Sequence, residues 1–454
     1  MKRGTNSPIN ATERSPLVSG ADQSYNNGAD QSSIDQTERK FTPVSAAMNT
    51  IKSFAGAGSF ALPWAMSNAG VFIGSIGLVL IALLANYTMT LLLKCNIKLS
   101  DEQLGSDQPP PSYSDLARRA FGRVGELIVC FINFSVTMSI CIAYLILIGA
   151  NLEMLTNSHI SSSVAIWIVL PIIVALSWVT DMKYLGFTSI FGAAALILAM
   201  ITVITYGIKD YSVEPLSHYK VDYANIPLWF GVAAFFFCNH IVVVPISHAS
   251  GDYRRYPSVL NASMVFITII NILFTTLGYL YFNFATVDGV VGVPSNIVMA
   301  LPNGIFANIV RACVIAELIC SFPIIVGAGL NVVDSSLEFF HNHFSAFPNN
   351  NKVCDDGSTK FFSRNWKFYV IRVIIIGILA AIGTTIKTFG SYTSLIGSLM
   401  LAIAGFVIPP LLYIRFFPEQ SKLSTTVHII ITVFGVAATI LGTYQSIDAL
   451  IKGN

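Results

Sequence analysis

Charged residues are scarce in this sequence. Asp, Glu, Lys and Arg make up 11% of its 454 residues, whereas hydrophobic residues make up 54%. Soluble domains carry about 25% charged residues, because their surfaces must be solvated. The shortage excludes a soluble globular protein and indicates an integral membrane protein whose outer surface contacts the lipid bilayer.

Patterns typical of enzymes and metalloproteins are also missing from the sequence. The seven cysteines follow neither a disulfide framework nor the spacing of a metal site. No nucleophile stands in a pattern with a general base. We therefore expect no enzymatic activity, no metal and no cofactor, and no nucleic-acid partner.

Long apolar runs are what the sequence does contain. A membrane-spanning helix needs about 20 apolar residues. Counted this way, the sequence predicts an all-α membrane protein with eleven transmembrane helices, at about 44–68, 71–94, 124–150, 164–181, 186–209, 226–248, 258–285, 304–336, 366–386, 389–415 and 424–449.

The loop charges predict the orientation. With a cytosolic N-terminus, sixteen Lys and Arg residues lie on the cytosolic side of the predicted spans and four on the other side. This asymmetry follows the positive-inside rule, and an odd number of spans then places the C-terminus in a lumen or outside the cell. The polar segment 1–42 is predicted to be a disordered cytosolic tail, and 43–454 to be the membrane domain.

The first predicted span has the composition of a broken helix. In "FAGAGSFALP" (54–63), Gly56 and Gly58 weaken the helix and Pro63 cannot donate a backbone hydrogen bond. Backbone groups freed within a membrane must find partners, and in transporters a substrate or an ion can provide them. The alternative is close glycine packing with an ordinary proline kink.

The sixth predicted span repeats this pattern. The stretch "FFCNHIVVVP" (236–245) also has Phe nine residues before Pro, with polar Asn239 and His240 at membrane depth. Polar side chains are rare there and usually functional. Two matched breaks, five spans apart, favour an inverted-repeat transporter.

Ordered motifs give the sequence a family resemblance. The stretches "GAGSFALPWAMSNAG" (56–70), "YSDLARRAFG" (113–122), "CIAYLILIGANL" (141–152) and "SFPIIVGAGLNVVDSSLE" (321–338) resemble the amino acid/auxin permease family, closest to its proton-coupled and vacuolar transporters. The resemblance runs from about residue 42 to 450. It implies a five-plus-five inverted repeat with helices 1 and 6 broken, plus one further helix.

The resemblance also implies a substrate site near the middle of the membrane. The amino acid would bind to the backbone of the first break and to residues of helices 3 and 6. The family's positions fall on Ala55, Gly56, Ala57, Gly58, Ser59, Tyr144, Phe237, Cys238, Asn239 and His240. Many relatives have a small residue where His240 stands, so this position departs from the family pattern.

The coupling ion is suggested by Lys52. In the sodium-coupled branch of the resembled family, an asparagine four residues before the first glycine helps to hold Na⁺, and here that position is Lys52. A fixed ammonium would replace the sodium ion, which favours protons as the coupling ion. The alternative is a lysine that snorkels to the cytosolic interface. Ser321 matches a position near the family's cation site, and Glu317 and His240 are the other candidate coupling groups.

The tail contains a candidate sorting signal. "ERSPLV" (13–18) resembles the acidic dileucine signal read by clathrin adaptors, with Glu13, Leu17 and Val18 in the key positions. It favours a lysosomal, endosomal or vacuolar membrane, with the plasma membrane as the alternative. The sequence as a whole predicts a secondary active transporter of small or neutral amino acids that works by alternating access. An amino acid sensor with little flux and a sodium-coupled transporter remain the alternatives.

Overall fold

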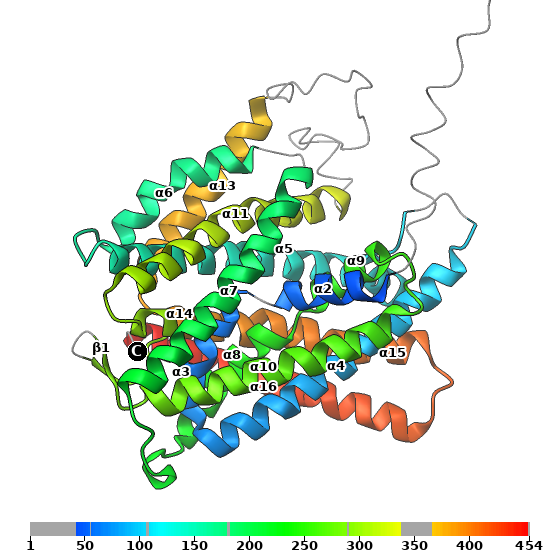
Figure 1. Cartoon of the computed structure of the whole chain (residues 1–454). Coiled ribbons are helices and arrows are strands. Elements are labelled where there is room, and N and C mark those ends of the chain that lie inside the picture. Colours follow the sequence, from blue (N-terminus) through cyan, green and yellow to red (C-terminus); the bar gives the residue numbers. More distant parts are fainter. Residues whose placement is uncertain are drawn as a thin grey trace, which may run out of the picture. The chain divides into compact units, whose positions relative to one another are not determined.

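The fold is almost entirely helical (Figure 1). The computed structural model describes residues 42–54, 56–105, 109–178, 182–287, 290–336 and 366–452. Within them, one small antiparallel ribbon pairs β1 (Thr286–Val287) with β2 (Val290–Val291). The predicted tail, except for its last residue, lies outside the described residues.

Eight helical spans of the described residues are long and apolar enough to cross a membrane. Six are single helices and two are composites of a pair. They are α4 (Val71–Glu102), α5 (Tyr113–Leu155), α7 (Met182–Asp210), α8 (Ile226–Phe237) with α9 (His240–Ala249), α10 (Tyr256–Phe282), α11 (Ile305–Ser336), α14 (Phe389–Ile396) with α15 (Ile408–Phe416), and α16 (Lys422–Lys452).

Further helical segments complete the described chain. Two shorter helices, α6 (Ser162–Ser177) and α13 (Trp366–Thr385), contain apolar stretches below the length of a full span. The first helical region consists of α2 (Pro43–Phe54), η1 (Ala57–Ala61) and α3 (Leu62–Ala69). Three 3₁₀ turns lie in connecting segments: η2 (Leu216–His218), η3 (Tyr223–Asn225) and η4 (Ile297–Ala300).

The helices pack in two groups. Helices α5, α6, α7, α11 and α13 contact one another, and α6, α11 and α13 lie together in the upper part of Figure 1. Helices α2, α3, α4, α8, α9, α10, α14, α15 and α16 make the second set of contacts. The broken helices belong to the second group, and α5 and α7 contact both groups. Two packed groups are what a rocking movement of one group against the other requires.

Helix α5 begins outside the apolar run. The Ser112 side chain accepts a hydrogen bond from the backbone N–H of Asp115, and the Asp115 carboxylate accepts one from the N–H of Ser112. This capping box satisfies two backbone donors that a helix start leaves free. The motif at 113–122 is therefore helical from its first residue.

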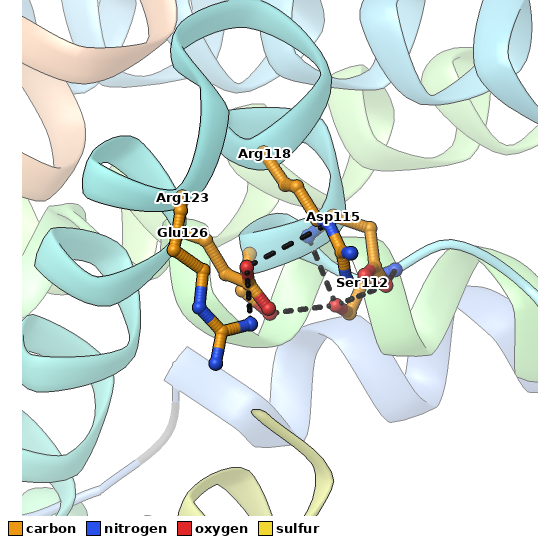
Figure 2. Close-up of polar contacts among 6 residues, drawn as sticks. Ser112, Asp115, Arg118, Arg123 and Glu126 are labelled. Atoms are coloured by element: carbon orange, nitrogen blue, oxygen red, sulfur yellow. Dashed lines mark hydrogen bonds and ion pairs between the residues drawn. The ribbon is translucent and has the colours of Figure 1, made fainter. Parts of the chain in front are cut away.

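A kink at Gly122 separates this first part of α5 from the membrane span. Gly122 has φ +70°, a backbone conformation that side-chain-bearing residues rarely adopt. Across the kink, Figure 2 shows Arg118 and Arg123 directed at the Glu126 carboxylate, at 3.7 and 3.0 Å. Glu126 is buried, and its ion pair with Arg118 joins the two parts of α5 across the kink.

The span between α14 and α15 is wound more loosely than an α-helix. Residues Gly397–Leu401 (η5) and Ile403–Val407 (η6) are π-helical, a form that occurs mostly as single turns at functional sites. Gly397 lies directly against the backbone of Gly231 in α8, where a Cβ atom would overlap the Gly231 carbonyl oxygen. These glycines hold α8 and the π-helical segment in close contact and so fix the position of the second broken helix.

Candidate substrate site at two broken helices

The first helical region is broken, as its glycines and proline predict. Helix α2 ends at Phe54, Gly56 is extended (φ −157°, ψ −169°), and a 3₁₀ turn leads into α3. Pro63 lies in the first turn of α3, where its missing N–H has no helical partner to lose. Ala55 falls outside the described residues. The break is thus a property of the local sequence.

The second break lies between α8 and α9. Cys238 (φ −86°, ψ 64°) and Asn239 (φ −90°, ψ 33°) leave the helical conformation, and α9 starts at His240. Unlike the first break it contains no glycine, and neither residue needs a positive φ. The predicted pair of broken helices is therefore present.

The two breaks meet in space. The Asn239 side-chain amide donates a 2.7 Å hydrogen bond to the backbone carbonyl of Ser53, 186 positions earlier in the chain. Gly58 lies against the end of α8, since a Cβ atom there would be 3.2 Å from the Phe235 ring. In Figure 1, α2 and α9 lie side by side, in agreement with their contacts.

Helix ends at the two breaks leave backbone groups without helical partners, and local bonds use some of them: Ser59 N–H donates to the Gly56 carbonyl (3.2 Å) and Asn239 N–H to the Phe237 carbonyl (3.0 Å). The last carbonyls of α2 and α8 and the first N–H groups of η1 and α9 lack helical partners. Carbonyl ends of helices attract cations and N–H ends attract anions. The two breaks together can therefore bind both charged groups of an amino acid, its ammonium and its carboxylate.

Two side chains add polar groups to the first break. Ser59 is 1% exposed, and its hydroxyl has no hydrogen-bond partner among the described residues. The Tyr144 hydroxyl, from α5, lies 4.0 Å from the position that a Cβ atom would take on Gly56. The structure thus brings Tyr144 to the break, where the family resemblance placed it.

The carboxyl group of Glu317 faces this region from α11. Glu317 accepts a 2.8 Å hydrogen bond from the Ser321 hydroxyl and packs against Gly192 of α7, where a Cβ atom would be 2.6 Å from Glu317 Cγ. Lys52, near the end of α2, and Tyr144 lie within electrostatic range of the Glu317 carboxyl, with no ion pair between Lys52 and Glu317 among the described residues. The half-buried Lys52, Glu317 and Ser321 are thus brought into one region beside the first break.

The His240 side chain is directed elsewhere. The fully buried ring places Nε2 2.9 Å from the Thr88 hydroxyl of α4, and it packs with Cys238 against Gly405 of η6. A Cβ atom on Gly405 would be 2.8 Å from Cys238 Sγ and 2.9 Å from His240 Cε1. These two residues therefore adjoin the break through their backbone, while their side chains contact α4 and η6.

The family model for transmembrane amino acid transporter proteins matches residues 39–448 of this sequence. The chain belongs to this family. The resemblance to amino acid/auxin permeases is confirmed, and the protein is a multi-pass membrane transporter, not an enzyme. Among the described residues, no group of three or more His, Cys, Asp or Glu could hold a metal ion.

Individual relatives come from Arabidopsis thaliana. The transporter is 27% identical to amino acid transporter ANT1 over 409 residues, covering 88% of this chain and 90% of the relative. It is 25% identical to amino acid transporter AVT3B over 422 residues, covering 89% and 92%. Among solved structures it is similar to a Na⁺-coupled sialic acid symporter in a substrate-bound outward-open state, with a TM-score of 0.48 and 11% identity, covering 88% of this chain and 89% of that chain.

Two features of the transporter's site escaped sequence reasoning. The hydrogen bond from Asn239 to Ser53 joins residues that no local pattern connects. The proximity of Glu317 to Lys52 depends on how α11 packs, and the only signal for it is a carboxylate within an apolar run. The sorting residues Glu13, Leu17 and Val18 lie outside the described residues.

Proposed function

We propose that the protein is a secondary active transporter that moves small or neutral amino acids together with protons by alternating access. The observation that carries this proposal is the junction of the two broken helices, held by the bond from Asn239 to Ser53. Membership of a transmembrane amino acid transporter family and relatives named as amino acid transporters support it.

In this proposal the backbone of the first break binds the groups common to all amino acids. The carboxylate accepts hydrogen bonds from the N–H groups of Ala57 and Gly58, and the ammonium donates to carbonyls at the ends of α2 and α8. The Tyr144 and Ser59 hydroxyls provide further polar contacts. Backbone recognition leaves the substrate's side chain to the surrounding residues, which favours small substrates beside the Phe235 ring.

The coupling mechanism follows from Lys52. Its ammonium lies within electrostatic range of Glu317, and in this proposal it repels a Na⁺ ion at the break. Glu317 takes up and releases the coupled proton, and the Lys52 ammonium balances the charge of its carboxylate. His240 is a second candidate proton carrier. Sodium coupling is the alternative, and it requires Lys52 to withdraw from the break toward the interface.

The finer architecture belongs to the same proposal. The broken first region α2–α3, the eight long spans and the two shorter helices α6 and α13 together form eleven transmembrane segments. The first five and the next five are related as inverted repeats, with α2–α3 corresponding to α8–α9. The N-terminus is cytosolic, and the membrane is lysosomal or vacuolar, with the plasma membrane as the alternative. A clathrin adaptor recognises the tail.

A counterflow assay separates a transporter from a sensor. Proteoliposomes are loaded with one unlabelled neutral amino acid at a time and diluted into a trace of the same labelled compound. A transporter exchanges one for the other, so we expect label to accumulate inside, transiently, at least about fivefold above empty liposomes. Binding of an amino acid, detected as thermal stabilisation, without exchange would instead establish the sensor. The proposal would be contradicted if no amino acid showed either binding or exchange.

A further inference from the structure

Two lysines lack the carboxylate partners that five arginines have, and among the described residues Arg415 of α15 lacks one as well, its guanidinium lying over the Phe121 ring. On the predicted cytosolic face, five arginines lie within ion-pair distance of an acidic side chain: Arg118, Arg119, Arg123, Arg254 and Arg255. Lys94 and Lys98 of α4 have no carboxylate within that distance among the described residues. Their positive charge is therefore available to a partner.

The ammonium groups of the two lysines lie over two aromatic rings, which we call the aromatic shelf. Lys94 Nζ lies 5.9 Å from the ring centre of Tyr413, and Lys98 Nζ lies 4.9 Å from that of Phe417. The ring centres of Tyr413 in α15 and of Phe417, which follows the helix, are 4.6 Å apart, so the four side chains form one row. Lys98 also donates a 2.8 Å hydrogen bond to the Phe416 carbonyl. Residues four apart share a face of α4, which places both ammonium groups on one side of the helix.

A buried histidine extends this cluster to α16. The fully buried His428 has Nε2 2.9 Å from the Tyr87 hydroxyl, and its ring centre is 5.0 Å from that of Tyr413. Its Nδ1 has no partner among the described residues. Three helices thus contribute polar and aromatic groups to one junction, which we call the α4/α15/α16 cluster: Tyr87, Lys94, Lys98, Tyr413, Phe417 and His428.

The cluster lies where the lipid-facing surface ends. Leu80 and Leu83 are each 60% exposed and Tyr87 is 41% exposed, and their spacing places them along one stripe of α4. Lys94 continues this stripe by two turns and is also exposed. On α16, Ile429 and Ile430 beside His428 are exposed apolar residues. An ammonium group at the end of a lipid-facing stripe meets the lipid headgroups rather than bulk water alone.

We propose that the α4/α15/α16 cluster binds the phosphate of an anionic phospholipid, with Lys94 and Lys98 as its cationic ligands. The aromatic shelf of Tyr413 and Phe417 supports the headgroup, and the acyl chains lie along the exposed stripe of α4. Simple snorkelling explains the exposure of Lys94. It does not explain two ammonium groups one turn apart over paired rings, without a carboxylate within ion-pair distance among the described residues. Basic pockets between transmembrane helices are a known form of headgroup site.

Lipid titration of the purified full-length protein tests this proposal. Thermal stability is measured in micelles as phosphatidylglycerol is added, with phosphatidylcholine as the neutral lipid and glycerol phosphate as the soluble anion. In the double variant K94Q/K98Q we expect the apparent affinity for phosphatidylglycerol to fall about thirtyfold. The matched control K209Q/K220Q removes two exposed lysines from the opposite side, and K94R/K98R keeps the charge. Both are expected to stay within about twofold of the unmodified protein.

Three outcomes would overturn the proposal. The first is unchanged affinity in K94Q/K98Q, and the second is an equal loss in K209Q/K220Q, because the binding would then reflect net charge alone. The third is stabilisation by glycerol phosphate at the same concentrations as phosphatidylglycerol, which would make the cluster a site for a soluble anion. If K94Q/K98Q does not fold, the single variant Lys94→Gln, at an exposed position, tests the proposal instead. Its apparent affinity for phosphatidylglycerol is expected to fall about fivefold, and an unchanged affinity would overturn the proposal.

Discussion

Valine in place of Gly58 is expected to impair transport strongly. A Cβ atom there would lie 3.2 Å from Phe235 and 3.4 Å from Phe236, and the two further methyl groups of valine have no room. Overpacking costs about 1–3 kcal/mol, and each 1.4 kcal/mol changes an equilibrium about tenfold. We expect uptake to fall at least about tenfold, because η1 must move away from α8 and the junction opens.

The matched control for this variant is Gly377→Val in α13. A Cβ atom on Gly377 meets nothing within 4 Å among the described residues, so the same change is expected to leave uptake within about twofold. Both variants are compared for expression, monodispersity and melting temperature before uptake is measured. A folded Gly58→Val protein with normal uptake would show that the break is not the site.

Asparagine in place of Lys52 is expected to uncouple transport from protons. The variant loses the ammonium that interacts with Glu317 and gains the residue found in the sodium-coupled branch. Uptake of the variant should no longer respond to an imposed pH gradient, and its ratio with and without the gradient should approach one. Glu317→Gln is expected to do the same, because the amide cannot exchange a proton.

The control for the coupling variants is Lys209→Asn, the same change at an exposed lysine at the end of α7. Its response to the pH gradient is expected to match that of the unmodified protein. Preserved proton coupling in both Lys52→Asn and Glu317→Gln would remove these residues from the coupling mechanism. Loss of coupling in Lys209→Asn as well would point to a general loss of activity.

Much of the backbone of the site was predictable because glycine and proline act locally. Gly56, Gly58 and Pro63 weaken a helix wherever they stand, so the break between α2 and α3 follows from ten residues of sequence. The second break was predicted from polar Asn239 and His240 at membrane depth, and it lies at Cys238 and Asn239.

Side-chain directions were not predictable from the same stretches. His240 was expected to be a candidate for the substrate, yet its ring contacts Thr88 and lies against Gly405. The direction depends on how α4 and η6 pack around α9, and these segments are distant in sequence. The link from Asn239 to Ser53 and the approach of Glu317 to Lys52 depend on tertiary packing in the same way.

The most direct measurement is uptake driven by a pH gradient in proteoliposomes, with the amino acid that exchanges best in counterflow. With one proton carried per substrate, one pH unit provides about 1.4 kcal/mol. We predict that an amino acid then accumulates about tenfold on the alkaline side, equally with sodium or with choline as the only other cation. Accumulation that requires a sodium gradient and ignores the pH gradient would contradict the account.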